Sequence, residues 1–560
     1  MDSRGGRPGA THFQSASHLM NVGLFLLALG PRLAAAWGHF VTSDELAWVY
    51  RSTRFLAALS TGDWAHTAQA GHPGVMTMWC GMIGILLRRL TAPQDAAAHL
   101  DWLAHLNWDY FDPYNGPALK QMAFFLVAGR LPVAILTSLA VVGIYLLAQR
   151  LWGQQVAFLG TVLLALDPFP VGLSAVLHVD ALTTSFMTLS LLALLIAVVK
   201  GGLFRWTAFS GALAGLAMLT KSPAIFLVPF TALILAVAFL AQRARALRFG
   251  GAFLLWLAVA VLTFCALYPA MWVSPGSTLQ SIFGAAEQHA VSLANLVFFC
   301  GRTAPDPGPF FYPVALAFRT SPVVWCGVLV AIPLFLRRRT TEWVHGRRLP
   351  LLALLVFSIL FAVFMTLPVK KFDRYLIPIF PALDLLAAAG LVGAAEWVSD
   401  KWRRGMPIVL STAIILQALI SLPYVPYFLA YENPLLGGPK GAAQVLPVGW
   451  GEGLDQTAAY LNGLEGAENM YVATGAVPHF APVFLGKTLP LNEANLPLAD
   501  YLVVTVGDEQ MRPAEIGALC PVPSWCTPCA WATWITRGYM PTPLTGWRMP
   551  TSRIRLNPAT

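Results

Sequence analysis

The segment HPGVMTMWCGMIGILLRRL, residues 72–90, decides how the chain is threaded through a membrane. It is apolar enough to be a marginal crossing, but it ends in the pair Arg88 and Arg89. If it crossed, every later loop would change sides, and the dense basic loops would face outward, against the bias of Lys and Arg toward cytoplasmic loops. We therefore predict an interfacial or partly embedded helix here, inside an outer loop that covers residues 38–121.

The composition is that of a multi-pass membrane protein. Of 560 residues, 57% are hydrophobic and only 11% are charged, whereas soluble domains carry roughly a quarter of charged residues. Apolar runs long enough to cross a bilayer predict about eleven crossings in a mainly α bundle over residues 1–427. The first run lacks a small-residue cleavage site and is expected to stay as a helix. The predicted crossings are residues 17–37, 122–149, 155–175, 181–199, 206–220, 222–241, 250–271, 311–336, 350–367, 373–396 and 406–427.

Basic residues lie in short clusters between the apolar runs. The net charge of +9 therefore does not indicate nucleic acid, because binding would need these residues on one solvated face. With the N-terminus inside, the dense clusters around Arg150, Arg205, Arg245 and residues 337–348 and 400–405 all fall on the inner side. We expect a multi-pass protein of a bacterial plasma membrane, with the outer loops and the C-terminal tail extracytoplasmic.

Residues 428–560 form a second predicted domain outside the membrane, a small α/β module. One helical pattern covers residues 453–464, and two strand patterns cover residues 469–475 and 499–507. The segment CPVPSWCTPC, residues 520–529, holds three of the seven cysteines. With no histidine nearby, an extracytoplasmic location favours one disulfide over a zinc site.

Two adjacent carboxylates, Asp44 and Glu45, follow the first crossing in TSDELAWVY. One interpretation is a capping box, with Thr42 as the N-cap and Glu45 as the third residue of an amphipathic surface helix. The other is catalysis. The two are compatible, because a rigid helix start also positions a catalytic group.

The predicted topology brings further ionisable residues to the same outer face. Each alone has a structural explanation, such as a snorkelling cation or a satisfied interior histidine, but charges at membrane helices are costly and need a partner or a function. Lys and Arg beside the outer leaflet suit a lipid-linked phosphate. A facing carboxylate can take a proton from an attacking hydroxyl. The residues are His72, Arg130, His178, Asp180, Lys221, Lys370, Lys371 and Arg374.

Other catalytic templates do not fit the sequence. There is no GxxxxGK[ST] or HExxH motif, and no convincing serine-hydrolase elbow. A divalent ion between Asp44 and Asp180 is conceivable, but two carboxylates are a thin ligand set. We expect no metal site and no obligatory cofactor.

The order of the motifs SDE, HPG, LHVDA, LTKSPAIFLVP and KKFDRYLIPIFPAL over residues 30–389 resembles the GT-C glycosyltransferases of family 39, the protein O-mannosyltransferase type, including aminoarabinose transferases. The resemblance implies a polyprenyl or dolichyl phosphate sugar as donor, a mannose-like hexose or a pentose as the sugar, and inversion by direct displacement. It also implies that Asp44 is the base with Glu45 as its orienting neighbour. Arg130, Lys221 and Arg374 would meet the phosphate, and His72, His178 and Asp180 would line the pocket.

The sequence departs from that family in two places. The loop 274–309 is too short for the trefoil domain of eukaryotic protein mannosyltransferases, and the tail motifs YENPLLGG (431–438) and VGWGEGLDQ (448–456) match no known acceptor-binding module. Protein and glycolipid acceptors therefore both stay open. The alternative function is a transporter or flippase of lipid-linked sugars, which would favour an inverted repeat and charges at mid-membrane.

Overall fold

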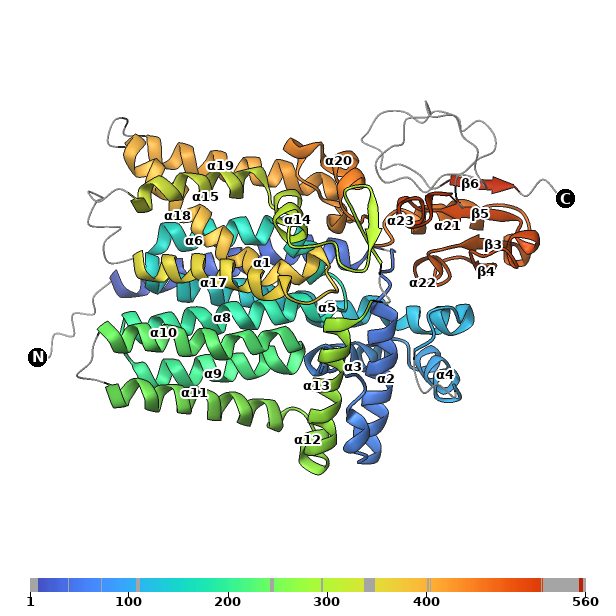
Figure 1. Cartoon of the computed structure of the whole chain (residues 1–560), viewed down its shortest axis with the longest axis horizontal. Helices are drawn as coiled ribbons and strands as arrows, with labels where there is room; N and C mark the ends of the chain where they lie inside the picture. Colours follow the sequence, from blue (N-terminus) through green and yellow to red (C-terminus); the bar gives the residue numbers. More distant parts are fainter. Residues whose placement is uncertain are drawn as a thin grey trace, which may run out of the picture.

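The computed structural model describes residues 9–38, 40–71, 73–106, 111–241, 246–293, 296–336, 348–399, 402, 404–514, 516 and 553–556. A helical bundle makes up most of the chain. One end of it, called the outer end below after the predicted topology, is covered by short helices and a small α/β domain (Figure 1). The first helix begins at the opposite end of the bundle from that domain, as the predicted topology requires. The bundle helices are α1 (Gly9–Ala36), α5 (Gly116–Trp152), α6 (Gln154–Leu166), α7 (Pro168–Ser174), α8 (Val179–Val199), α9 (Leu203–Thr220), α10 (Leu227–Ala241), α11 (Ala246–Ala266), α14 (Phe311–Arg319), α15 (Pro322–Leu336), α17 (Arg348–Thr366), α18 (Phe380–Ser399) and α19 (Gly405–Ser421).

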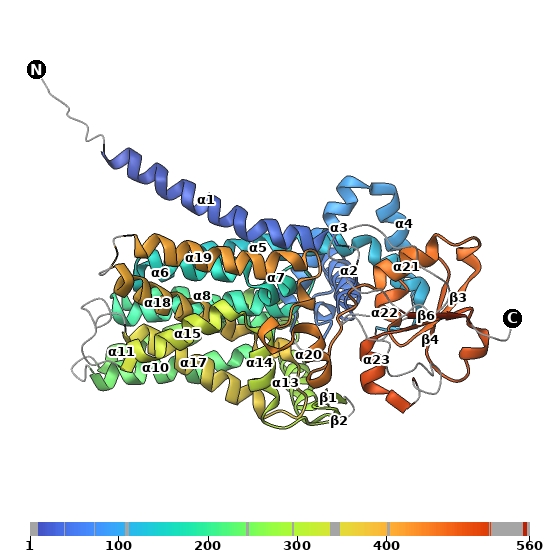
Figure 2. The ribbon, with the colours of Figure 1, turned by 90° about the horizontal axis from the view of Figure 1, so that it is seen from above.

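The mainly α membrane fold is confirmed, and the count of crossings is close to the prediction. Over the described residues, 8 helices are long and apolar enough to span a membrane, or up to 10 if each of two bent pairs is one span. The predicted crossing at 206–220 is α9, which is not among these candidates but packs along α8 and α11. Figure 2 shows α1 leaning away from the bundle toward its N-terminal end. The predicted number of eleven crossings is reached only when both bent pairs and α9 are each counted as a crossing.

Two predicted crossings are broken rather than continuous. The run 155–175 divides into α6 and α7 with a bend of 64°, and the run 311–336 divides into α14 and α15 with a bend of 113°. Proline explains the positions of both breaks, because a proline disfavours helical backbone in the residue before it, here Asp167 and Ser321. The second break turns α14 aside and brings Arg319, its last residue, against the start of the segment 373–379.

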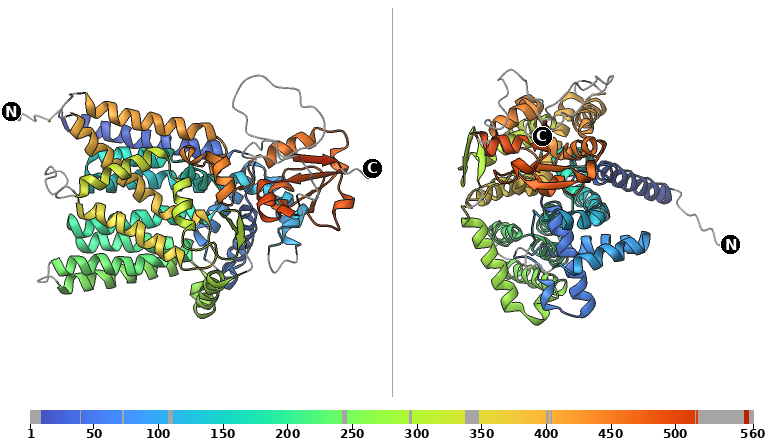
Figure 3. Two further views of the ribbon diagram at one scale, coloured as in Figure 1. Left: turned by 45° about the horizontal axis from the view of Figure 1, so that its top comes forward. Right: turned by 90° about the vertical axis from the view of Figure 1, so that its right-hand side faces the viewer.

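The segment 72–90, on which the predicted topology depends, forms α3 (Val75–Thr91) and is not among the candidate spans. It lies across the outer end of the bundle with α2 (Glu45–Thr61), α4 (Pro93–Ala104), α12 (Ala270–Val273) and α13 (Pro275–Val291) (Figures 1 and 3). One face of α3 is buried against α2 and α5, and Leu90 at its end is exposed. This arrangement is compatible with an interfacial helix, which stays a prediction.

The tail contains the predicted α/β module with more strands than the sequence indicated. Helix α21 (Leu454–Asn462) and strands β3 (Tyr471–Thr474) and β5 (Tyr501–Val504) were predicted, whereas β4 (Lys487–Pro490) and β6 (Arg553–Leu556) were not. The sheet order is β4-β3-β5-β6, with β3 parallel to both β4 and β5 and with β6 antiparallel to β5. Short helices also belong to the tail: α20 (Gly438–Val445), α22 (Val477–Phe480) and α23 (Val506–Met511). The cysteine segment 520–529 lies outside the described residues.

Three short 3-10 helices carry or flank the polar residues at the outer end of the bundle. They are η2 (Ser222–Phe226), η4 (Asp373–Ile379) and η5 (Leu422–Tyr424), and η2 and η4 lead directly into α10 and α18. After η5 the chain does not leave the bundle at once. Leu429, Ala430, Ala442 and Val448 belong to the same buried apolar cluster as α6 and α18. The tail is therefore joined to the membrane part by packing as well as by sequence.

Candidate active site

Asp44 stands at the start of α2, where it occupies the N-cap position without a side-chain capping bond. The predicted cap, Thr42, is therefore not the N-cap, and Glu45 is the first helical residue instead of the third. The Asp44 carboxylate is 40% exposed, and its Oδ2 lies 2.9 Å from Nη2 of Arg374 and 3.4 Å from Nε2 of His178. Burial opposes its ionisation, but the charges of Arg374 and His178 outweigh this effect and hold the pKa of Asp44 well below its usual value.

Glu45 points the other way, into the protein. Its buried carboxylate takes a two-pronged pair from Arg130, Nε to Oε1 at 2.7 Å and Nη2 to Oε2 at 2.6 Å. It also accepts the backbone N–H of Leu177 at 2.9 Å and that of Thr42 at 3.1 Å, so the reciprocal half of the predicted capping box does form. Glu45 thus ties α2, α5 and the start of α8 together.

Arg130 has no donor left for a phosphate. Besides its two bonds to Glu45, it donates to the backbone oxygens of Ala36, Gly38 and Phe40, which accounts for its five N–H groups. Its side chain is fully buried. The geometry therefore gives no support to the predicted contact of Arg130 with the donor phosphate. In the structure, Arg130 holds the loop that leads to Asp44.

His178, Asp180 and Lys221 form a connected chain behind Asp44. The Nδ1 of His178, the N-cap of α8, lies 3.1 Å from Oδ2 of Asp180. The other oxygen of Asp180 pairs with the ammonium of Lys221, which stands between α9 and η2. Burial alone would lower the pKa of His178, but the carboxylates of Asp180 and Asp44 raise it above 6.5. The predicted grouping of these residues on one face is present in the geometry.

Arg374, in η4, is the cation at the centre of the group. It contacts Asp44, and its Nε lies 3.6 Å from Oδ2 of Asp180. Its guanidinium also faces aromatic rings, 4.9 Å from the ring centre of Phe372 and 4.9 Å from that of Trp450 in the tail. The ring of Tyr375 lies 4.3 Å from Nζ of Lys221. Aromatic faces therefore support both cations.

Lys370 and Lys371 have separate surroundings. Lys371 is buried and donates to Oδ1 of Asp306 at 2.7 Å and to the carbonyl of Pro368 at 2.8 Å, so it ties down the outer loop. Lys370 is close enough to Arg374, Asp44 and Lys221 to interact with their charges, and burial and Arg374 lower the pKa of its ammonium. Lys370 is thus the more available of the two at the site. His72 lies outside the described residues.

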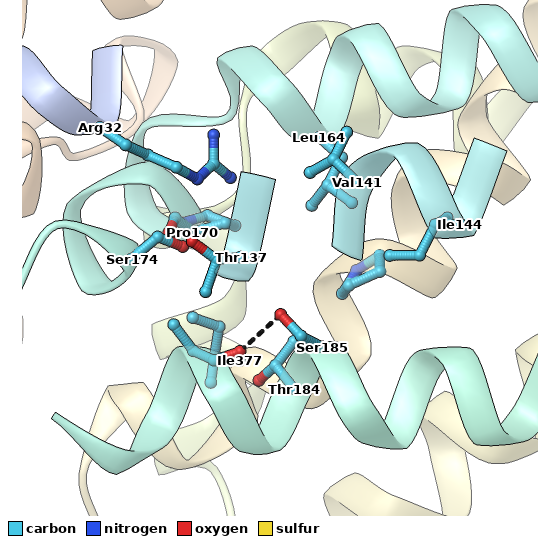
Figure 4. A pocket seen from close by; sticks show the side chains of 12 residues that line it. Arg32, Thr137, Val141, Ile144, Leu164, Pro170, Ser174, Thr184, Ser185 and Ile377 are labelled. Carbon is cyan, nitrogen blue, oxygen red and sulfur yellow. Dashed lines mark hydrogen bonds between the residues drawn. The ribbon is translucent and has the colours of Figure 1, made fainter. Parts of the chain in front are cut away.

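A cavity lies one helical turn deeper in the bundle. Ala181 and Thr184 of α8 and Ile377 of η4 line it, so it sits next to Asp180 and Arg374 along both elements (Figure 4). Arg32 of α1 reaches its wall, and the hydroxyl of Thr184 and Nε of Arg32 are buried without a hydrogen-bond partner. A partly polar cavity therefore lies beside the charged site along α8 and η4.

The sequence did not single out a second buried ion cluster beside the site. Nε of Arg319 donates to Oδ2 of Asp373 at 2.7 Å, and its Nη1 lies 3.1 Å from Oε1 of Glu432. The sequence did contain one signal for this cluster: Arg319 lies within the predicted crossing 311–336, where an arginine is rare without a partner or a function. Among the described residues no three His, Cys, Asp or Glu side chains converge in a way that could hold a metal ion.

Comparison with known proteins gives one family model that matches part of the chain and several solved structures of similar fold. Residues 122–272 match the family model described as dolichyl-phosphate-mannose-protein mannosyltransferase. ArnT from Cupriavidus metallidurans in the apo state matches with a TM-score of 0.50 and 16% identity, over 91% of this chain and 96% of that one. The structure of the same ArnT bound to undecaprenyl phosphate matches with a TM-score of 0.48 and 17% identity, over 92% of this chain and 96% of that one. The archaeal oligosaccharyltransferase AglB from Archaeoglobus fulgidus matches with a TM-score of 0.43 and 12% identity, over 89% of this chain and 70% of that one. No curated protein sequence matches the chain.

The family match and the shared fold confirm the predicted resemblance to GT-C glycosyltransferases. The predicted enzyme class, a membrane glycosyltransferase, is confirmed with it. The individual site residues are not matched by these comparisons. Their roles therefore depend on the geometry of this chain.

Proposed function

We propose that the chain transfers a sugar, a hexose or a pentose, from a polyprenyl or dolichyl phosphate carrier to an acceptor hydroxyl. One observation carries the proposal: the partly exposed Asp44 carboxylate contacts Arg374, which is linked through Asp180 to Lys221, and both cations lie at the ends of membrane helices. A base and a phosphate site are then adjacent at the level where a lipid headgroup lies. The family match, whose model is named for a dolichyl phosphate mannose donor, supports the same donor class.

The reaction is a direct displacement at the anomeric carbon. The acceptor oxygen forms a bond to that carbon while the bond from the carbon to the phosphate oxygen breaks, and its electron pair leaves with the phosphate. Asp44 takes the proton of the attacking hydroxyl. Because the hydroxyl and the phosphate stand on opposite sides of the carbon, the configuration inverts.

The charges around Asp44 suit the leaving group. The donor is a phosphodiester with one negative charge, and the released polyprenyl phosphate carries more. Three cations can stabilise the developing negative charge, namely Arg374, Lys221 and Lys370. Arg51 on α2 is also close enough to interact with the charge of Asp44. Fixed cations in a partly dry site stabilise such charge without reorganisation. This supply of positive charge supports the expectation that no obligatory metal is needed, which dialysis against EDTA would test.

We propose that the acceptor approaches the partly exposed Asp44 from the side of the tail domain. We also propose that this side is extracytoplasmic, with a protein or a glycolipid as acceptor. The bundle, its outer helices and the tail then form one enzyme between a lipid-linked donor and an acceptor beyond the membrane.

The test uses the purified full chain in nanodiscs with a short-chain polyprenyl phosphate sugar, with membranes of the source cells supplying acceptors. We expect release of polyprenyl phosphate with transfer of the sugar, and an inverted anomeric centre by NMR. Asp44→Asn should lower turnover by about 100-fold or more, whereas Asp95→Asn, an exposed carboxylate on α4, should not. Near-normal turnover of Asp44→Asn with an unchanged melting temperature would remove Asp44 as the base.

A further inference from the structure

One loop of the tail domain reaches into the site. It is the segment Val448–Gly453, called the tail loop below, whose sequence VGWGEG belongs to a motif that the proposed reaction does not use. Gly449, Gly451 and Gly453 all have left-handed backbone, with φ of +103°, +99° and +81°. Such a run of glycines lets the chain turn sharply on either side of Trp450 and Glu452.

Trp450 lies against the central cation of the site. The ring centre of Trp450 is 4.9 Å from Cζ of Arg374, whose Nη2 in turn lies 2.9 Å from Oδ2 of Asp44. A tryptophan face is the strongest aromatic partner for a guanidinium. A residue of the tail is therefore one contact away from the proposed base.

Glu452, on the other side of the tail loop, lies near the ion cluster just before Arg374. The backbone N–H of Trp450 donates to Oε2 of Glu452 at 2.6 Å, and Glu452 is close enough to Arg319 and Asp373 to interact with their charges. The Oδ1 of Asp373 accepts the backbone N–H of Arg374 at 2.7 Å. The tail loop thus contacts η4 at the side chain of Arg374, and Glu452 adds a buried carboxylate near the ion cluster around Asp373.

Close packing fixes the position of the tail loop. A Cβ added at Gly451 would lie 2.3 Å from the carbonyl oxygen of Val41 and 2.6 Å from Cδ2 of His479. Val41 leads to Asp44, and His479 belongs to α22 of the tail. Nothing lies within 4 Å of a Cβ added at the neighbouring Gly449. The loop is therefore seated at Gly451 between the two domains.

The tail itself is docked on the outer helices. Val477 and Ala481 belong to the same buried apolar cluster as Leu46 and Trp48 of α2. Lys120 of α5 donates to the carbonyl oxygens of Leu485 and Gly486 at 2.8 and 2.9 Å. Because the tail is docked in this way, the tail loop has a defined position next to Arg374.

We propose that Trp450 is a positioning residue, through which the tail domain holds the Arg374 guanidinium between Asp44 and the donor phosphate. This inference rests on the proposed function. The indole ring acts as a wall behind the guanidinium, so Arg374 meets the phosphate from a fixed position instead of as a free side chain. The tail domain is then a part of the catalytic site and not an appended module.

The first test compares Trp450→Leu with Trp450→Phe in the full chain in nanodiscs. A short-chain polyprenyl phosphate is the binding probe, measured by calorimetry, and donor turnover is measured in parallel. We expect Trp450→Leu to weaken binding and to lower kcat/KM by roughly 5- to 20-fold, in keeping with the strength of a partly desolvated cation–π contact. The Phe variant, which keeps an aromatic face, should recover most of the loss. Equal losses in both variants would overturn the proposal.

The second test asks whether Trp450 acts through Arg374. In an Arg374→Gln background, Trp450→Leu should have little further effect on binding of the probe, because the cation that it holds is gone. Additive losses would overturn the proposal. Gly451→Ala should also reproduce the loss, whereas Gly449→Ala, which bears a similar backbone strain without the clash, should lose much less.

The outcome is separable from that of the proposed function. If the wild-type chain transfers no sugar from any polyprenyl phosphate donor, the proposed function fails. If the wild-type chain is active and Trp450→Leu keeps normal probe affinity and kcat/KM, only the role of Trp450 fails. Tyr460→Leu, at an exposed aromatic residue of α21, controls for general damage to the tail.

Discussion

Nη2 of Arg374 lies 2.9 Å from Oδ2 of Asp44, so the proposed base is already paired with a cation before any substrate binds. The pair lowers the pKa of Asp44 and makes it a poor proton acceptor in this state. In the proposed reaction, a donor phosphate would compete with Asp44 for the same guanidinium. Binding of the donor would therefore loosen the pair and return basicity to Asp44 at the moment when the acceptor hydroxyl needs it.

Lys370 offers a clean test of the phosphate side of the site. It is only partly buried, whereas Lys221 is paired with the buried Asp180, so removing Lys221 would leave a buried charge uncompensated. We expect Lys370→Ala to raise the KM for the donor severalfold, with little change in melting temperature and a weaker dependence on salt. Lys440→Ala, at an exposed lysine of α20, is the matched control. An unchanged donor KM would place the phosphate away from Lys370.

Glu45 and Arg130 should behave as a structural pair and not as catalytic groups. Both side chains are fully buried, and their carboxylate and guanidinium are 2.6 Å apart. Glu45→Gln leaves the Arg130 charge uncompensated and is expected to cost about 3–5 kcal/mol of stability. Thermal unfolding in detergent would show this as a lower melting temperature.

The same pair allows a coupling test. Because each single change strands one partner, Glu45→Gln and Arg130→Gln together should destabilise the protein less than the sum of the two. Normal melting temperatures with abolished turnover would instead assign Glu45 a direct catalytic role.

The membrane fold could be predicted from the sequence because hydropathy and the distribution of basic residues report on it directly. The apolar runs located the helices, and Arg88 with Arg89 argued against a crossing at α3, which is not among the candidate spans. The bends at Asp167 and Ser321 were missed, since a proline within an apolar run shows that a helix is disturbed and not by how much. The order of Asp44, His178, Asp180, Lys221 and Arg374 along the chain indicated a shared face, and they do meet.

Contacts between distant segments could not be predicted in the same way. Nothing in the pattern distinguished Arg130, which is paired with Glu45, from Arg374, which contacts Asp44, because both are arginines near the outer ends of predicted crossings. The approach of Trp450 to Arg374 depends on how the tail docks, and docking is decided by packing between segments far apart in sequence. The glycines around Trp450 were visible, but their partner was not.

His178 should give the enzyme a pH dependence on the alkaline side. The ring faces the carboxylates of Asp44 and Asp180 as well as the cation Arg374, and its pKa is raised above 6.5 in the folded protein. Its contribution to stability is therefore full below pH 6.5 and is lost as the pH rises through the folded pKa. We expect kcat/KM to fall over that window, because the neutral ring no longer holds both carboxylates.

A pH profile of kcat/KM would check this, since that ratio reports groups of the free enzyme. His178→Gln should remove the alkaline fall while lowering activity at neutral pH. His105→Gln, at an exposed histidine at the end of α4, should leave the profile intact. An alkaline fall that survives in His178→Gln would assign the titration to another group.

Glu432 should make the protein less stable at alkaline pH. Its buried carboxylate faces Arg319, but burial, Asp373 and Glu452 raise its pKa from 4.5 to about 8. The folded state therefore binds a proton that the unfolded state releases, so stability falls as the pH rises from 4.5 toward 8.

Glu432→Gln, a neutral side chain of similar shape, should flatten this fall and raise the melting temperature at pH 8 relative to the wild type. Melting curves at several pH values would measure it. Glu468→Gln, on a short helix of the tail and with an exposed carboxylate, serves as the control. If the stability of Glu432→Gln changed with pH as steeply as that of the wild type, Glu432 would be ionised over this pH range and would form an ion pair with Arg319.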